Sequence, residues 1–418
     1  MLIENYRHSA FAVYYAMSAV TGLANAVMFT TATMYYVQEL GLNPLQLVLI
    51  GTILELSYFL FEMPTGVLAD TYGRRLSVIV AFGVLGAAFV MKGGVPFAFD
   101  WFGGWIPLFA LALAAEAIRG VGEAFLSGAQ TAWIVGEVGE SRMGAVFAKG
   151  NQLRQLFAAA GILVSVALAE ISLMLPFLVG GVLYLCLTGY AALRMPERNF
   201  RPSHREEEGA IRTMTTTFAE GVRLVKRKPA LWTIMLASFF FGAASEGFDR
   251  LWEAQLLTEI GLPELGALGA VGWFGVIALV GMGIGAASNE WFVRRFNMAD
   301  DSVVEKTVFW TTVCKVVLIA CFALSGSLVY ALIAVWALGI VNALFYPAYE
   351  TWVNRNLEDR SRATVLSMFS QSDALGQTFG GPGVGWIGFR WSLRASLLTA
   401  AALLLPIVVA LRSTKTKT

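Results

Sequence analysis

The chain has 418 residues, of which 57% are hydrophobic and 14% charged, and its mean hydropathy is +0.65. Soluble domains carry about 25% charged residues, and a soluble protein of this size could not bury so much apolar surface. The composition therefore excludes an ordinary soluble protein and indicates a chain solvated by lipid, while the formal net charge of +1 identifies no partner.

Mostly apolar runs, each long enough for a membrane-spanning helix of about 17–25 residues, follow one another along the chain. The first run is too long for a signal peptide and is followed by no cleavage site, so we expect it to be retained. We count twelve such runs, with approximate centres at Ala24, Tyr58, Gly83, Ala117, Ile162, Leu183, Phe241, Ile277, Leu318, Gly339, Gln377 and Ala401.

The connections are short except for residues 195–229, which are polar and charged. We therefore predict an all-α membrane protein of twelve transmembrane helices, arranged as two pseudo-symmetric six-helix bundles. Residues 1–194 form the N-terminal bundle, residues 195–229 a cytoplasmic linker, and residues 230–418 the C-terminal bundle.

The distribution of Lys and Arg predicts the orientation, because cytoplasmic loops carry an excess of both. One side of the predicted helices holds most of them: Arg74, Arg75, Arg142, Lys149, Arg198, Arg201, Arg205, Arg212, Arg223, Lys226, Arg227, Lys228, Arg294, Arg295, Arg355, Arg360, Arg362, Arg412, Lys415 and Lys417. The opposite side offers only Lys92, Arg390 and Arg394. Both termini and the linker are thus expected in the cytoplasm, with the protein multi-pass in the inner (plasma) membrane.

The two halves repeat each other at an offset of about 219–220 residues, as expected of transporter folds. One match pairs Gly66 and Asp70 with Ala286 and Glu290 in the loop after the second helix of each half. A longer match pairs Gly120, Ala124, Ala129 and Trp133 with Gly339, Ala343, Ala348 and Trp352. Two matches in the correct relative positions indicate a duplication.

A glycine- and arginine-rich loop follows the second predicted helix, with the pattern Gly66-x-x-x-Asp70-x-x-Gly73-Arg74-Arg75. This pattern resembles the cytoplasmic loop signature of the major facilitator superfamily. The resemblance covers nearly the whole chain and implies a conformational latch, in which Asp70 pairs with the far half or the fourth helix. Arg142 is a plausible partner.

The fourth helix resembles the bacterial drug-efflux (drug:proton antiporter) members of that superfamily. Arg119 and the run from Gly120 to Ile134 carry the similarity, but Glu123 stands where such exporters have glycine, and the fifth helix lacks their proline-glycine motif. The resemblance implies export, and these departures leave the direction of transport open.

The fourth helix also carries charges where they are costly, since an ionisable residue at the bilayer centre costs about 2.5–3.5 kcal/mol. Glu116, Arg119 and Glu123 line one stripe of the helix, so Arg119 can pair with either glutamate. The fully ionised triad has one net negative charge, and protonating one glutamate leaves a neutral pair. The triad is therefore a candidate for proton coupling, the alternative being a permanent structural ion pair.

Two further helices carry acidic groups. Glu55 and Glu62 share one face of the second helix, and Glu55 is a candidate proton carrier or cation contact, unless it is simply hydrogen-bonded to a neighbouring helix. The seventh helix carries a group that could be a gate, a substrate contact or a proton relay, or could mark an early helix end: Glu246, Asp249, Arg250 and Glu253.

Two ionisable residues remain in later helices. We expect Lys315 to reach the interface or to make a structural pair, and Asp373 to join either the latch region or the substrate cavity. The run Gly381-Pro382-Gly383 is expected to break or kink the eleventh helix.

No nucleotide loop, metal-ligand cluster or activated nucleophile is recognisable, so we predict no enzyme, no cofactor, no metal and no nucleic-acid partner. The leading hypothesis is proton-coupled export of small amphipathic or cationic organic compounds by a monomer, because aromatic and acidic groups suit such solutes. The coupling ion could also be sodium. The alternatives are a proton symporter that imports an organic acid, sugar or peptide, with Arg119 binding a carboxylate, and a lipid-translocating or receptor protein.

Overall fold

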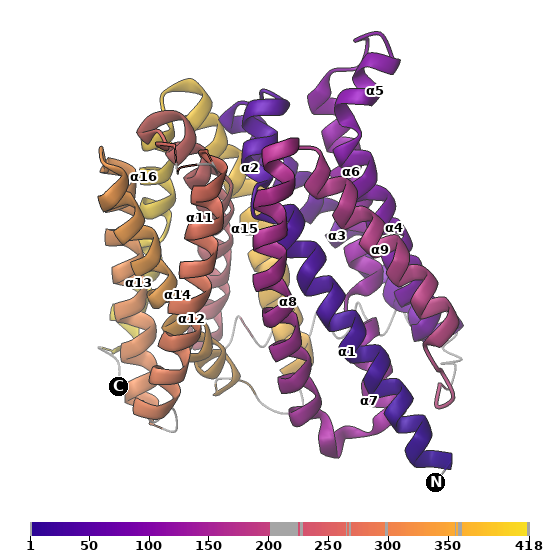
Figure 1. The fold of residues 1–418 in the computed structure, drawn as a ribbon. Coiled ribbons are helices and arrows are strands. Elements are labelled where there is room, and N and C mark those ends of the chain that lie inside the picture. The colour runs from indigo at the N-terminus through magenta and orange to yellow at the C-terminus, as the bar shows by residue number, and fades with distance from the viewer. Residues whose placement is uncertain are drawn as a thin grey trace. The chain divides into compact units, whose positions relative to one another are not determined.

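The computed structural model describes residues 2–200, 229–264, 269–296, 300–355 and 362–415, together with the single residues 225, 266 and 357. Most of the linker at 195–229, with all of its basic residues except Arg198, therefore lies outside the described residues. Within the described residues the regular structure is entirely helical (Figure 1).

The first half of the chain comprises α1 (Leu2–Phe29), α2 (Ala32–Met34), η1 (Tyr35–Glu39), α3 (Pro44–Tyr72), α4 (Arg74–Gly93), α5 (Val95–Trp101), α6 (Leu108–Leu126), α7 (Ala129–Val138), η2 (Glu140–Arg142), α8 (Met143–Ile171) and α9 (Leu175–Arg194). The second half comprises α11 (Pro229–Gln255), η3 (Leu256–Ile260), α12 (Val271–Arg295), α13 (Asp301–Leu324), α14 (Leu328–Arg355), α15 (Arg362–Arg390), α16 (Leu393–Leu403) and α17 (Leu405–Lys415). Every predicted centre falls within a helix, which confirms the all-helical architecture.

Ten helical segments of the described chain are long and apolar enough to cross a membrane. Of the twelve predicted spans, α6 and α15 are the two that do not meet this criterion. The reason is composition: α6 contains Glu116, Arg119 and Glu123, and α15 is rich in glycine and polar residues. The number of twelve crossings therefore stays a prediction.

The chain divides into two compact units. Unit 1 consists of Met1–Leu42, Ile53–His204 and Pro263–Ala278, and unit 2 of Asn43–Thr52, Arg205–Leu262 and Leu279–Thr418. Each unit thus includes the first turns of a helix, α3 or α12, that otherwise belongs to the other unit.

The repeat seen in the sequence extends to helix packing. In unit 1, α1 lies along α8, and in unit 2, α11 lies along α15 (Figure 1). Gly22 of α1 touches the carbonyl oxygen of Arg154 so closely that a methyl group there would collide with it. Gly242 of α11 meets the carbonyl oxygen of Asp373 in the same way. Because these pairs match at the repeat offset, both halves use the same close helix–helix contact.

The ends of the first helix of each half also correspond. α11 runs directly into the five-residue π-helical turn η3, and α1 is followed by α2 and then by the corresponding turn η1. The two turns end in the matching sequences Glu39-Leu40-Gly41-Leu42 and Glu259-Ile260-Gly261-Leu262. This third match, again at an offset of 220, supports the duplication.

The sequence predicts a break or a kink at Pro382; a break is wrong, because α15 continues through this residue to Arg390, and a kink stays a prediction. A proline late in a long helix loses one backbone hydrogen bond, and packing against α11 keeps the helix continuous. The fourth predicted helix breaks between α6 and α7, at Ser127 and Gly128.

Candidate functional site

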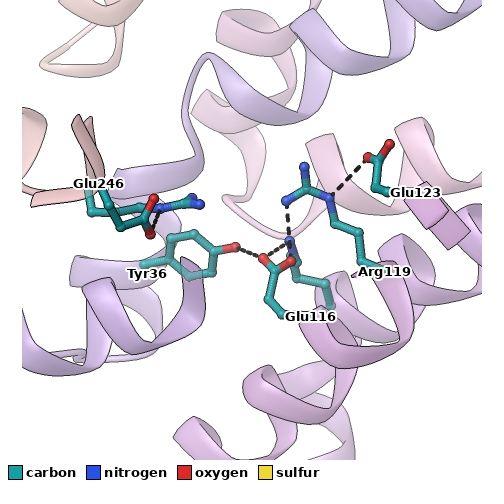
Figure 2. A network of polar contacts seen from close by, with 7 residues as sticks. Tyr36, Glu116, Arg119, Glu123 and Glu246 are labelled. Carbon is teal, nitrogen blue, oxygen red and sulfur yellow. Dashed lines mark hydrogen bonds and ion pairs between the residues drawn. The ribbon is translucent and has the colours of Figure 1, made fainter. Parts of the chain in front are cut away.

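A buried ion pair lies at the centre of the charged cluster in unit 1. The ammonium of Lys92, on α4, donates a hydrogen bond to Oε1 of Glu116 on α6, and the two side chains are 0% and 1% exposed. Tyr36 donates from its hydroxyl to the same oxygen at 2.8 Å (Figure 2). The side chain of Lys92 therefore lies within the helix packing, and its place on the side opposite the cytoplasm stays a prediction.

The guanidinium of Arg119 connects the two glutamates of α6. Its NH1 group donates to Oε2 of Glu116 at 3.3 Å, and its Nε lies 3.6 Å from Oε1 of Glu123 (Figure 2). The spacings i,i+3 and i,i+4 place these side chains on one helix face, as predicted. Its guanidinium carbon also lies 4.7 Å from the centre of the Phe29 ring.

Aromatic rings surround the ammonium of Lys92. Its Nζ lies 5.1–5.9 Å from the ring centres of Phe177, Phe89, Tyr36 and Phe29. Aromatic faces stabilise a desolvated cation, so these rings add to the carboxylate of Glu116 in stabilising the buried ammonium.

With Lys92 included, the unit 1 cluster contains two cations and two carboxylates and is neutral when fully ionised. The triad alone would have carried one negative charge. Protonating Glu116 would therefore leave two cations facing one carboxylate. The geometry favours a positioning role for Glu116, while 37% of the Glu123 side chain is exposed and open to exchange.

On α11 in unit 2, two neighbouring carboxylates differ in their contacts. Glu246 is buried and accepts a hydrogen bond at 2.9 Å from Nε of Arg250, one turn along the helix (Figure 2). Asp249 is exposed and makes no hydrogen bond or ion pair with any described residue, although its charge interacts with those of Glu246, Arg250 and Lys315. Since α11 continues to Gln255, Asp249 does not mark an early helix end.

Lys315, on α13, lies in an aromatic environment of unit 2. Its side chain is 9% exposed, and its Nζ lies 3.7 Å from the ring centre of Phe345, 5.1 Å from that of Tyr346 and 5.5 Å from that of Phe241. The expectation that this lysine reaches the interface is wrong, because the rings of α11 and α14 enclose its ammonium.

Asp373 lies near this group. It is half-buried on α15 and accepts a hydrogen bond from Nε2 of Gln377 at 2.8 Å. Its charge interacts with Tyr346 and Tyr349 of α14, and Asp249 interacts with the same Tyr346. Asp373 therefore shares the neighbourhood of Asp249 in unit 2.

The glutamates of α3 occupy a different place from the α6 cluster. Glu62 is exposed and accepts a hydrogen bond from the Tyr58 hydroxyl at 3.0 Å, and that hydroxyl is 2.8 Å from the Ser127 hydroxyl at the end of α6. Glu55 is half-buried two turns earlier on the same helix. Glu62 thus has a partner on its own helix, and the Tyr58 hydroxyl links that partner to the end of α6.

The glycine- and arginine-rich loop positions the start of α4. Gly73 has φ +121°, a conformation that side chains rarely adopt, and this brings the Glu197 carboxylate against the helix end. Oε1 of Glu197 accepts the backbone N–H of Arg75 at 2.9 Å. Arg75 and Arg74 donate in turn to the carbonyl oxygens of Ala192 and Ala132, both at 2.7 Å. The loop therefore joins α4, α7 and the end of α9.

The predicted latch pair is not formed in this structure. Asp70 is exposed and makes no hydrogen bond or ion pair within the described part of the chain, and Arg142 likewise contacts no acidic group there. Gly66 has nothing within 4 Å of where a side chain would begin.

Several residues that hold this region together were missed by the sequence analysis. The Trp133 indole donates to the carbonyl oxygen of Pro196 at 2.6 Å, and buried Glu137 accepts the N–H groups of Arg198 and Asn199, both at 3.1 Å. The only available signal was the repeat match at Trp133, since contacts over more than 60 residues leave no periodic pattern.

Comparisons with known proteins agree with this architecture. The family model described as Major Facilitator Superfamily matches residues 14–299. The chain is 25% identical over 405 residues to the uncharacterized MFS-type transporter YxaM of Bacillus subtilis (strain 168), covering 95% of this chain and 94% of that protein.

Solved structures share the fold at low sequence identity. The nucleoside transporter NupG matches with a TM-score of 0.71 at 12% identity, covering 97% of this chain and 98% of that one. A bacterial homolog of the human lysosomal transporter Spinster matches with a TM-score of 0.72 at 15% identity, covering 97% of each chain. A POT family transporter bound to a thioalcohol-conjugated peptide matches with a TM-score of 0.72 at 12% identity, covering 98% of this chain and 96% of that one.

Proposed function

The chain belongs to the Major Facilitator Superfamily and is a multi-pass membrane transporter, and from this premise we propose that it exports small amphipathic or cationic organic compounds in exchange for protons. The proposal includes twelve crossings, with α6 and α15 also in the membrane, cytoplasmic termini and alternating access between two six-helix bundles. Charged side chains within α6 and α11 are energetically costly in a membrane, so we expect each of them to be paired or to serve transport.

The observation that carries the proposal is that the carboxylate of Asp249 is both exposed and unpaired among the described residues. This exposed carboxylate lies on a candidate span and has no hydrogen-bond or ion-pair partner in the described chain, so a proton or a cationic solute can neutralise it. One carboxylate cannot bind both at once. Binding of either ligand therefore displaces the other, which is the requirement for exchange.

We assign different roles to the other acidic groups. Glu123 and Asp373 are further proton or cation contacts, because each is partly accessible and has few partners. Glu116 positions Arg119 and Lys92 and does not exchange protons. Glu55, on α3, remains a candidate proton carrier or cation contact, ranked after Asp249, Glu123 and Asp373.

The alternative of an importer of organic acids, sugars or peptides is less well supported. It requires Arg119 to bind a substrate carboxylate, but this guanidinium already lies against both Glu116 and Glu123. An acidic substrate would have to displace one of them. Lipid translocation and a receptor function have no feature that favours them over export.

We also propose that the latch of Asp70 forms in another conformation of the transport cycle. Its free carboxylate and the accessible Arg142 leave both groups available for pairing. Gly73, Arg74 and Arg75 have a constant role in this proposal, since their contacts to the end of α9 and to α7 hold the loop in place.

The test uses purified protein in liposomes that contain a pH-sensitive dye, with an imposed proton gradient and ethidium or tetraphenylphosphonium added as cationic solute. We expect each cation to evoke proton movement in the wild type, and this movement to be lost in Asp249→Asn and reduced in Glu123→Gln. Glu290→Gln is the matched control, because Glu290 forms an exposed pair with Arg294 on α12. Proton movement that is unchanged in Asp249→Asn would refute the assignment, and no response to any cation would refute cation export.

A further inference from the structure

We propose that Phe241, Phe345 and Tyr346 form a binding site for an organic ammonium group, which Lys315 occupies as a built-in cation and from which a cationic solute displaces it. The transport consequence of this inference rests on the proposed function, whereas the site itself does not. The three rings and the lysine all lie in unit 2.

The rings come from two helices and enclose one charge. Phe241 lies on α11, and Phe345 and Tyr346 are adjacent on α14, while Lys315 reaches them from α13. The 3.7 Å separation of Nζ from the Phe345 ring centre is direct contact with the ring face. Aromatic faces attract cations electrostatically, and enclosed ammonium groups are the ligands that such cages recognise.

The ammonium of Lys315 lacks the partners that usually stabilise a buried lysine. It donates no hydrogen bond to any described residue and forms no ion pair there, although the charge of Asp249 acts on it. An ammonium has three N–H donors, and Lys92 uses one of its own in a hydrogen bond to the carboxylate of Glu116. Lys315 is therefore held by the rings and by the charge of Asp249, and a solute cation can interact with both in the same way.

One wall of the cage is accessible. Tyr346 is 57% exposed and Asp249 is exposed, whereas Phe345 is 3% exposed and forms the floor. A solute can thus approach from the side of Tyr346 and Asp249. The flexible four-carbon stem of Lys315 allows its charge to withdraw without a change in the helices.

Competition with a tethered cation has a consequence for transport. An incoming cation must overcome the repulsion of Lys315, so its affinity is lower than the cage alone would provide. As Lys315 returns to the rings it displaces the solute again. Lys315 therefore sets the affinity and favours release.

The test is chemical rescue of Lys315→Ala, which removes the resident ammonium and leaves its space. n-Butylammonium is the probe, and thermal unfolding of the detergent-solubilised full chain is the readout. We expect half-maximal stabilisation at an n-butylammonium concentration at least about tenfold lower in Lys315→Ala than in the wild type, the size of a desolvated cation–π contact. Lys306→Ala removes an exposed lysine from the same helix and is the matched control, for which we expect no gain.

Two comparisons separate the cage from simpler explanations. 1-Butanol, of equal length and no charge, should not replace n-butylammonium, and equal rescue by both would mean cavity filling only. Adding Phe345→Leu to Lys315→Ala should abolish the gain, and its persistence would mean that Asp249 alone attracts the amine. Either result, or no rescue at all, would overturn the inference.

The liposome assay then tests the transport consequence separately. Lys315→Met should lower the half-saturating concentration of ethidium, and Lys315→Arg should leave it nearly unchanged. Rescue without any cation transport would retain the ammonium site and refute only the proposed function.

Discussion

The buried pair of Lys92 and Glu116 allows a sharp prediction, because its two members are not equally dependent on each other. Glu116→Gln leaves Lys92 entirely buried without its carboxylate, and two cations then face only Glu123. Lys92→Met leaves Glu116 with Arg119 at 3.3 Å and the Tyr36 hydroxyl at 2.8 Å. The glutamate variant should therefore be the less stable of the two.

The magnitudes follow from the burial. Loss of one partner from a buried pair costs about 3–5 kcal/mol, and we expect this range for Glu116→Gln. Lys92→Met should cost about 2–3 kcal/mol, because the remaining hydrogen bonds to the charged carboxylate are retained. The double variant keeps the cluster neutral through Arg119 and Glu123, so it should be more stable than the sum of the single effects predicts by about 1–3 kcal/mol.

The assay is reversible unfolding in mixed detergent micelles, with the free energy of unfolding taken from the helical circular dichroism signal. The double variant of the exposed pair Glu290 and Arg294 is the control and should change stability by less than about 1 kcal/mol. Equal losses of unfolding free energy in both single variants would contradict the unequal dependence of the two side chains, and strict additivity in the double variant would contradict their coupling.

Three further predictions concern the same unit. Glu197→Ala should lower the free energy of unfolding by about 1 kcal/mol, because the start of α4 loses its cap. The segment after α9 should then be cleaved faster by protease, since Glu197 no longer holds it against α4; an unchanged cleavage rate would contradict this contact. Gly22→Ala should cost about 1–3 kcal/mol by collision with the α8 backbone, whereas Gly189→Ala, with nothing within 4 Å, should cost nothing; equal melting temperatures would be inconsistent with the close contact. Tyr36→Phe should lower the free energy of unfolding by about 1.5–3 kcal/mol because the charged Glu116 loses a donor, and the loss should fall to about 0.5–1.5 kcal/mol when Glu116→Gln is already present, because a neutral amide oxygen is a weaker acceptor.

The sequence determined the membrane class and the helices, since lipid forces each backbone segment to satisfy its own hydrogen bonds. Apolar run length therefore located all twelve predicted helices. The stripe of Glu116, Arg119 and Glu123 was also predictable, because residues three and four apart on one helix must be neighbours.

Only the tertiary structure decided which partners these groups meet on other helices. Lys92 precedes Glu116 by 24 residues and lies on α4, so no periodicity connects them. From the sequence, Lys315 was expected to reach the interface or to make a structural pair. The structure instead places its ammonium among rings of α11 and α14. Helical spacing orders side chains along one helix, but the balance of charge in a cluster depends on how separate helices pack.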